Sequence, residues 1–301
     1  MRHVTDAMVD AAVDARDAER TMLEAFRSLG EGGSAMQERI RTEAGGTKLS
    51  TLGAVIPHQG YAGAKVYTTI AGQFSFVILL FDAKDGRPLA SFDAAAITRL
   101  RTAATSMVAS RYLARRDAAT LGLFGAGTQG RAHVLQFARE YPLTEIRVFD
   151  PHVDDSVCDE MARNCGIPVR RSDAESIAGD SDIIVTASRS KIPLFSGASL
   201  KAGCFIAAIG SSLPNTRELD DIALSRATRI AVDWSPQTLR EAGDLVMASP
   251  EAIAGKVVDL ADVITGKVPG RTSDNEITLY KSVGVGLQDI ALAGLVWSRL
   301  P

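Results

Sequence analysis

Three glycines with the spacing G-x-G-x-x-G follow directly on a short apolar run, a pattern typical of dinucleotide binding. They lie in the segment Thr120-Leu-Gly-Leu-Phe-Gly125-Ala-Gly127-Thr-Gln-Gly130. The first permits a tight turn, the second lets backbone approach a pyrophosphate, and the third allows strand and helix to pack closely. Free N–H groups at the start of the following helix would hold the phosphates. The residues expected to bind the cofactor here are Gly125, Gly127, Thr128, Gln129 and Gly130. The alternative is a structural glycine turn in an α/β domain without cofactor.

An acidic residue, Asp150, follows the next strand-like run and lies 25 residues after Gly125. A carboxylate at this place accepts hydrogen bonds from the adenosine ribose and repels a 2′-phosphate, so we expect NAD(H) rather than NADP(H). Ligands of open α/β sheets bind beyond the carboxyl ends of the strands. Two further strand ends should therefore face the same crevice. For each of their residues, the alternative is that it is an ordinary loop residue without a role in binding. These ends supply Thr186, Ser188 and Gly210.

Four cationic residues outside this region are candidates for holding a substrate carboxylate. Lys65 opens a strand-like run, Arg101 lies in an alanine-rich stretch, and Arg39 and Arg41 would share one face of a strand because they are two residues apart. A nicotinamide enzyme acting on an amino or imino acid needs cations for the carboxylate, and arginine binds it through two parallel hydrogen bonds. Arg101 suits that role. For each residue taken alone, the alternative is a solvated surface charge.

Asp233 ends the apolar run Arg229-Ile-Ala-Val-Asp, a place where acids commonly donate or accept protons. Its alternative role is to cap the segment Trp234-Ser-Pro that follows. No G-x-S-x-G elbow occurs, and Cys204 lies within an apolar run that reads as a buried strand. Nucleophilic hydrolysis therefore lacks its parts.

Composition excludes several classes of protein. The chain has 301 residues, a net charge of −3, 46% hydrophobic and 23% charged residues, which excludes disorder and the basic footprint of a nucleic-acid-binding protein. The long apolar stretch at residues 74–81 is interrupted by Ser75 and is far shorter than the roughly 20 residues of a membrane-spanning helix.

The cysteines and histidines indicate the compartment and argue against a metal site. Three cysteines without C-x-x-C spacing are typical of free thiols, and the acidic first 30 residues lack the apolar block of a secretory signal. We therefore expect a cytoplasmic protein. Its four histidines have unrelated spacings, so no metal site is expected.

The elements that must position these residues change character along the chain. Apolar residues at helical spacing predict a helix over 5–29, and strand-like runs follow at 47–55, 65–70, 74–82 and 88–92. A helix over 94–114 comes next. Beyond it, apolar runs at 120–124, 145–149, 182–187, 204–209 and 229–233 alternate with helical segments, and a last helix covers 285–298. This alternation predicts an α/β fold with a doubly wound parallel sheet.

The run from Arg101-Thr-Ala-Ala to Gly125-Ala-Gly-Thr-Gln closely resembles the ornithine cyclodeaminase/mu-crystallin family. Further family-like stretches extend the resemblance from about Arg39 to the C-terminus. They are Gly63-Ala-Lys65-Val, Asp85-Gly-Arg-Pro-Leu-Ala, Ala208-Ile-Gly-Ser, Arg217-Glu-Leu-Asp220, Asp233 with Gln237, and Ser282-Val-Gly284 with Gln288-Asp289.

The resemblance implies a homodimer whose protomer joins a Rossmann-type doubly wound parallel sheet to a discontinuous α+β domain. Residues 1–112 would form the substrate-binding and dimerisation domain, completed by the C-terminal helix within 278–301. Residues 113–277 would form the NAD-binding domain.

The same resemblance implies roles for single residues by motif match. Lys65 and Arg101 would bind the substrate carboxylate, with Arg39 or Arg41 as a further ligand, and Asp233 would be the general acid/base. Lys65 would also be catalytic, because cations on the carboxylate draw electron density from the imine. The shared chemistry is hydride transfer between a nicotinamide and the α-carbon of a small amino acid, with an imine as oxidised partner.

One departure from the family pattern bears on the substrate. Ornithine-specific members carry a Glu three residues before the proline that matches Pro57, and here that position is Ala54. We therefore expect an NAD(H)-dependent amino-acid dehydrogenase or ketimine reductase. The alternatives are an ornithine cyclodeaminase, which forms L-proline and ammonia without net redox change, and a crystallin-like binding protein with little turnover.

Overall fold

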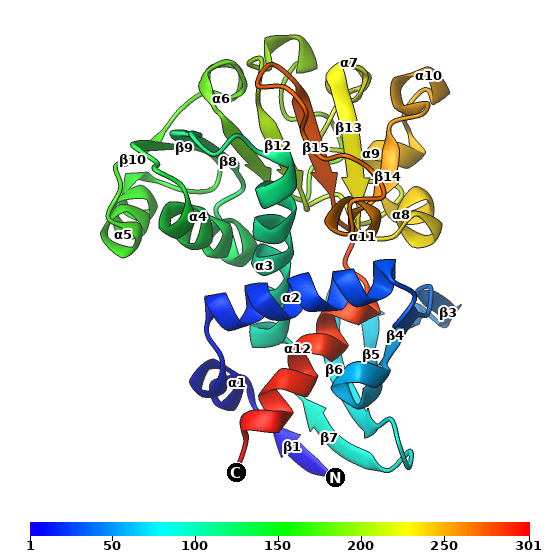
Figure 1. The fold of residues 1–301 in the computed structure, drawn as a ribbon. Helices are drawn as coiled ribbons and strands as arrows, with labels where there is room; N and C mark the ends of the chain where they lie inside the picture. Colours follow the sequence, from blue (N-terminus) through cyan, green and yellow to red (C-terminus); the bar gives the residue numbers. More distant parts are fainter. The chain divides into compact units, whose positions relative to one another are not determined.

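The computed structural model describes all 301 residues, and they divide into two compact units (Figure 1). Unit 1 comprises Met1–Thr105 and Gly284–Pro301, and unit 2 comprises Ser106–Val283. The chain therefore starts in unit 1, builds unit 2 from one continuous segment and returns to unit 1. No helix of either unit is both long enough and apolar enough to cross a lipid bilayer.

Unit 1 is built on a seven-stranded, largely antiparallel sheet. Its strands are β1 (Arg2–Val4), β2 (Ala35–Met36), β3 (Ile40–Ala44), β4 (Thr47–Ile56), β5 (Tyr61–Ile70), β6 (Gln73–Asp82) and β7 (Pro88–Phe92). They are arranged in the order β1-β7-β6-β5-β4-β2, with β3 also paired to β4. Only β1 and β7 pair in parallel, because short hairpins join the long strands β4, β5, β6 and β7.

The N-terminal helical region differs from its prediction as one helix over 5–29. It forms α1 (Asp6–Ala12) and α2 (Ala15–Gly30), separated at Val13 and Asp14, which have extended backbone. The Asp14 side chain accepts from the Asp17 N–H at 2.9 Å, and the Asp17 side chain accepts from the Asp14 N–H at 3.3 Å. This capping box starts a new helix inside a continuous helical pattern of apolar residues.

One face of the unit 1 sheet is covered by the C-terminal helix α12 (Gly286–Arg299), which packs on β4, β5 and β6. Leu52, Ile56, Ile78 and Leu80 are fully buried on that face. A side chain at Gly286 would come within 2.4 Å of the Gly53 carbonyl oxygen, so glycine lets the helix start against the strand. The remaining helices of unit 1 are the 3-10 turn η1 (Pro57–Gln59) and the first half of α3 (Ala95–Leu113).

Unit 2 is an eight-stranded parallel sheet flanked by helices (Figure 1). Its strands are β8 (Thr120–Phe124), β9 (Glu145–Phe149), β10 (Val169–Arg171), β11 (Ile183–Thr186), β12 (Phe205–Ala208), β13 (Ala227–Val232), β14 (Val257–Asp259) and β15 (Ile277–Lys281). Its helices are α4 (Thr128–Glu140), α5 (Asp155–Cys165), α6 (Ala174–Asp180), α7 (Asp221–Arg226), α8 (Ser235–Glu241), α9 (Gly243–Val246), α10 (Pro250–Ile253) and α11 (Leu260–Ile264), with a 3-10 turn η2 (Gly197–Ser199). The doubly wound parallel sheet predicted from the sequence is confirmed.

The order of the strands, β10-β9-β8-β11-β12-β15-β13-β14, fixes where a ligand can bind. From β8 the chain winds outward through β9 and β10, then returns to the other side of β8 and continues through β11 and β12. The sheet therefore reverses its winding direction at β8, and such a switch point is where open α/β sheets bind ligands.

Strand β15 was not predicted from the sequence. It is fully buried between β12 and β13, although it contains Thr278 and Lys281. Residues 278–283, assigned above to the segment that completes the first domain, lie in unit 2, as do residues 106–112. Because of these polar residues, the sequence does not indicate a buried strand. Each of them is buried together with a partner that only the fold brings close to it.

Candidate functional site

The glycine loop of unit 2 has the geometry that a dinucleotide requires. Gly125 has φ +93°, and a Cβ there would lie 2.7 Å from the Ala187 carbonyl oxygen. A Cβ on Gly130 would lie 2.0 Å from the Gly125 carbonyl oxygen, whereas the space beside Gly127 is open to 4 Å. Gly127 is the N-cap of the 13-residue helix α4 and leaves the first turn without a side-chain cap. Thr128 and Gln129 lie in that turn. The first N–H groups of an α-helix have no acceptor within the helix, so the start of α4 is suited to binding phosphate oxygens.

Asp150 follows β9 and is bonded to the glycine loop. Its carboxylate accepts from the Ala126 N–H at 2.9 Å and from the His152 N–H at 2.9 Å. These bonds fix a partly exposed negative charge beside the turn between β8 and α4. A ribose diol can donate to such a carboxylate, and a 2′-phosphate would be repelled by it.

A buried histidine supports the start of α4 from inside the unit. His133 Nδ1 lies 2.7 Å from the Gln129 carbonyl oxygen, which can only accept, so this nitrogen carries the proton. Nε2 then accepts from the Ser106 hydroxyl at 2.8 Å. Burial lowers the pKa of His133 to about 4, so the ring is uncharged near neutrality. His133 therefore has a structural role in supporting the first turn of α4.

Thr186, Ser188 and Gly210, predicted to face the crevice, converge on one carboxylate that sequence reasoning missed. Glu218 accepts from the Thr186 hydroxyl at 2.8 Å, from the Ser188 N–H at 2.7 Å and from the Gly210 N–H at 2.9 Å. Glu218 is fully buried. Its only signal in the sequence was its place in the family-like stretch Arg217-Glu-Leu-Asp220.

Asp233 lies just after β13 and is fully buried. Its carboxylate accepts from the Tyr280 hydroxyl, from the Ser282 hydroxyl at 2.8 Å and from the Val283 N–H at 2.8 Å. The alternative role of helix cap is wrong, because Trp234 occupies the N-cap position of α8. Asp233 is thus held in one orientation by donors on and after β15.

Unit 1 contains a buried cluster in which two cations share one carboxylate. Arg101 Nε donates to Asp289 Oδ1 at 3.3 Å, and Lys65 Nζ donates to the same oxygen at 3.4 Å. Arg101 Nη1 also donates to Gln288 Oε1 at 2.6 Å. The side chains of Lys65, Arg101 and Asp289 are 4%, 9% and 0% exposed. Two buried positive charges facing a single negative charge leave an excess that an anionic ligand would neutralise.

The surroundings of Lys65 lower the pKa of its ammonium group. Nζ donates to the Thr98 hydroxyl at 2.6 Å and lies 4.7 Å from the centre of the Phe76 ring. Burial lowers the pKa of Lys65 to about 8; Asp289 opposes this shift, and the charges of Arg101 and Arg39 add to it. A bound carboxylate would favour the protonated ammonium.

The two candidate arginines near β3 differ in their position and contacts. Arg39 lies one residue before the strand, and its Nη2 donates to the Gly284 carbonyl oxygen at 2.8 Å. Its charge also acts on Lys65. Gly284 has φ +76°, and a Cβ there would lie 2.8 Å from Arg101 Nη2. Arg41 lies within β3, paired opposite Ser50, so the two arginines do not share one strand as expected.

Two members of this cluster were not predicted as site residues. Thr98 lies on α3 with Arg101, and Asp289 lies in the first turn of α12. A usable signal for Asp289 was present in the sequence, since it is the one acid of a helix whose central residues are apolar. Neither residue has a spacing that reveals its partner, because the contacts with Lys65 span 33 and 224 residues of chain.

Comparison with known proteins agrees with this geometry. Residues 1–301 match the model of a family described as the ornithine cyclodeaminase/mu-crystallin family. Among solved structures, the chain is similar to a probable ornithine cyclodeaminase from Bordetella pertussis Tohama I. The two are 55% identical with a TM-score of 0.97, over 99% of this chain and 96% of that chain.

Two more distant structures contain a nicotinamide cofactor. One is the Δ1-pyrroline-2-carboxylate reductase of Thermococcus litoralis in complex with NADH and L-proline, at 26% identity and TM-score 0.92 over 99% and 97% of the two chains. The other is an archaeal alanine dehydrogenase dimer with bound NAD, at 28% identity and TM-score 0.90 over 99% and 95%. The family and fold class predicted from the sequence are confirmed, and the expected NAD(H)-dependent oxidoreductase chemistry agrees with these relatives.

Proposed function

Because the chain belongs to the ornithine cyclodeaminase/mu-crystallin family, we propose that it is an NAD(H)-dependent oxidoreductase that interconverts a small L-amino acid and its imine or keto acid. The observation that carries the substrate assignment is the sharing of Asp289 by Lys65 and Arg101. An α-carboxylate is the substrate group that such an excess of buried positive charge would bind.

The cofactor would be held by residues of unit 2. The N–H groups at the start of α4 bind the pyrophosphate, and Asp150 binds the adenosine ribose. Bound NADH supplies the hydride that reduces a C=N bond, and NAD⁺ accepts one in the reverse direction. The relatives solved with NADH or NAD support this choice.

The carboxylate of the substrate would be bound by Lys65 and Arg101, with Arg39 as the further arginine ligand. A carboxylate paired with these cations withdraws electron density from the neighbouring C=N carbon, which favours hydride addition at that carbon. Asp233 would exchange the proton at the substrate nitrogen. A positioned acid or base of this kind contributes roughly 10²- to 10⁴-fold.

Ornithine cyclodeamination is the nearest rival, and the residues near Pro57 argue against it. Ala54 offers no anionic partner for a second ammonium, and it is 5% exposed. Glu43 is the acid closest to it along the chain on that side, and it is paired with Lys48 at 3.1 Å. Burying an unpaired ammonium is costly, so we propose a substrate with a short neutral side chain or a cyclic imine.

The test measures kcat/KM for L-ornithine and for a panel that includes pyruvate with methylamine and a cyclic imino acid. We expect kcat/KM for L-ornithine to be at least about tenfold lower than kcat/KM for the best imine. This corresponds to a difference of about 1.4 kcal/mol in transition-state binding. Efficient release of proline and ammonia from ornithine without net change of NADH would establish the cyclodeaminase instead. NADH binding with negligible turnover of every substrate would favour the crystallin-like alternative.

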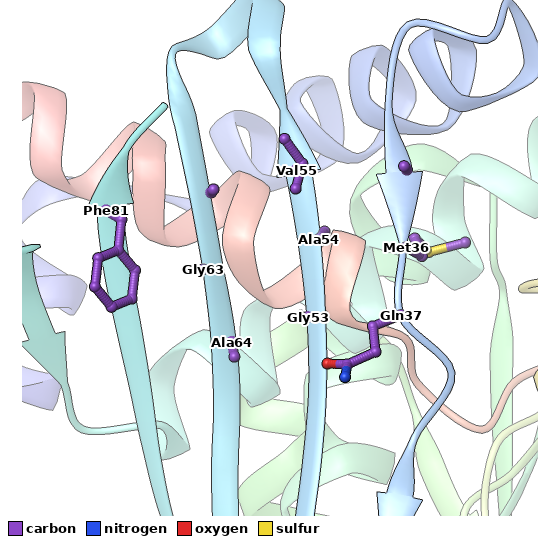
Figure 2. A pocket seen from close by; sticks show the side chains of 10 residues that line it. Met36, Gln37, Gly53, Ala54, Val55, Gly63, Ala64 and Phe81 are labelled. Carbon is purple, nitrogen blue, oxygen red and sulfur yellow. The ribbon is translucent and has the colours of Figure 1, made fainter. Parts of the chain in front are cut away.

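We also propose that the protein is a homodimer through the face of the unit 1 sheet that α12 leaves uncovered. On this face Gly53, Val55 and Ala64, with Met36, Gln37 and Phe81, line an open hollow of about 430 Å³ (Figure 2). Val55 is 46% exposed although it is apolar. A second copy of the same face is the occupant we assign, and the archaeal relative solved as a dimer supports it.

The three free cysteines support a cytoplasmic location.

A further inference from the structure

Glu218 is surrounded by hydrogen-bond donors. Besides the Thr186 hydroxyl and the Ser188 and Gly210 N–H groups, its carboxylate accepts from the Ser188 hydroxyl at 2.7 Å and from the Ser211 N–H at 3.1 Å. A carboxylate offers only acceptors, so it can satisfy all five donors. An amide in its place would direct its own N–H groups at some of them.

These donors belong to two loops that follow adjacent strands. Thr186 ends β11 and precedes Ser188, whereas Gly210 and Ser211 follow β12. The two loops are in contact with each other, since a Cβ on Gly210 would lie 2.2 Å from the Ser188 carbonyl oxygen and 2.4 Å from Glu218 Oε1. Glu218 therefore joins the loops at the carboxyl ends of β11 and β12.

A second buried layer fixes Glu218 itself. Asp244 Oδ1 accepts from the N–H groups of Glu218 and Leu219 at 2.6 and 2.9 Å. Asp244 Oδ2 is paired with Lys281 Nζ at 2.8 Å, and both side chains are fully buried. Lys281 ends β15, the strand next to β12. The carboxyl ends of three neighbouring strands are thus tied together by one chain of buried charges.

The order of the strands indicates which end of the cofactor these loops would meet. Asp150, assigned to the adenosine ribose, follows β9, and the phosphate-binding turn follows β8. Strands β11 and β12 lie on the other side of β8 from β9. A dinucleotide that runs from Asp150 across the turn of β8 therefore extends its nicotinamide end toward β11 and β12.

We propose that Glu218 is a positioning residue that holds the Thr186–Ser188 and Gly210–Ser211 loops in the conformation that receives the nicotinamide end of NAD(H). This inference rests on the proposed function, since it presupposes that unit 2 binds the dinucleotide. Glu218 would not touch the cofactor; its effect would pass through the loops.

The experiment compares the affinities of Glu218→Gln for NADH and for ADP-ribose, which lacks the nicotinamide ring. We expect the variant to bind NADH about tenfold more weakly or worse, while its affinity for ADP-ribose stays within about twofold of wild type. Asp182→Asn is the matched control. Asp182 is also a buried carboxylate of unit 2, but it binds the N–H groups of Ala119 and Thr120 at the start of β8. Its substitution should leave the ratio of the two affinities unchanged.

Equal weakening of both ligands by Glu218→Gln would overturn the proposal, because it would indicate a general structural role. So would an unchanged affinity for NADH. If Glu218→Gln does not fold, Thr186→Val removes one of the five donors with little change of shape and should weaken NADH selectively, by a smaller factor. Failure of wild type to bind either ligand would instead contradict the proposed function.

Discussion

Lys65 and Arg101 donate to the same oxygen of Asp289, although the lysine is 224 residues and the arginine 188 residues away from it in the chain. The arrangement leaves one buried positive charge of this pair without a matching negative charge. A substrate carboxylate would balance this charge.

Arg101→Ala should abolish turnover and leave the affinity for NADH nearly unchanged, because the guanidinium is assigned to the substrate carboxylate. Loss of a buried charged partner typically costs 2 to 5 kcal/mol, roughly 30- to 5,000-fold in kcat/KM. Steady-state kinetics and NADH titration measure the two effects separately. Arg99→Ala is the control: it lies on the same helix, and its partner Asp10 is half exposed. An equal loss of NADH affinity in Arg101→Ala would show that the residue is wrongly assigned.

The value of kcat/KM should fall as the pH rises above about 8. Lys65 has a pKa of about 8 because of its burial, so alkaline solution removes the proton and with it one of the cations that attract the carboxylate. The pH profile of kcat/KM reports groups of the free enzyme and is the appropriate measurement. In Lys65→Arg the cation persists at all these pH values, so the alkaline fall should disappear even if the activity is lower. A wild-type profile that is flat to pH 9.5 would contradict this role.

NADPH should bind at least about tenfold more weakly than NADH, because its 2′-phosphate would meet the Asp150 carboxylate. Asp150→Ser should reduce this preference by weakening NADH and relieving the repulsion of NADPH. Fluorescence titration of both cofactors against both proteins gives the four constants needed. Tighter binding of NADPH than NADH by wild type would mean that Asp150 does not face the ribose.

Val55→Asp should convert the proposed dimer into a monomer of 31.9 kDa. Val55 lies on the uncovered sheet face, and pairing of two such faces would bury the new charge without a partner. Ile222→Asp is the matched control, since Ile222 is 48% exposed on α7 of unit 2 and Val55 is 46% exposed. Sedimentation at micromolar concentration should find a dimer for wild type and for the control. A monomeric wild type would contradict the assembly.

Much of unit 2 could be predicted because its signals are local. The glycine loop, Asp150 and most parallel strands depend on residues close together in the sequence, and periodicity describes them well. The capping box at Asp14 was also local, but the helical pattern continued across it. Strand β15 could not be recognised, because Thr278 and Lys281 are buried only by virtue of partners far away in the chain.

The charged partners of the site residues could not be predicted from the sequence. Glu218 and Asp289 lie in family-like stretches, but only the fold shows that their partners are Thr186 and Lys65. The choice between Arg39 and Arg41 stayed open for the same reason. It depends on the contact of Arg39 with Gly284, which is 245 residues away.

Whether Lys65 and Arg101 bind a substrate carboxylate can be tested by following nicotinamide absorbance during reduction of a cyclic imino acid and of the matching cyclic imine without a carboxylate. We expect the imino acid to be reduced, with one NADH consumed for each molecule of cyclic amino acid formed. We also expect the imine without the carboxylate to react at least about a hundredfold more slowly, since Lys65 and Arg101 would have no anion to bind. Equal rates for the two compounds would contradict carboxylate binding by Lys65 and Arg101, and no consumption of NADH with any imine or keto acid would contradict the proposed oxidoreductase.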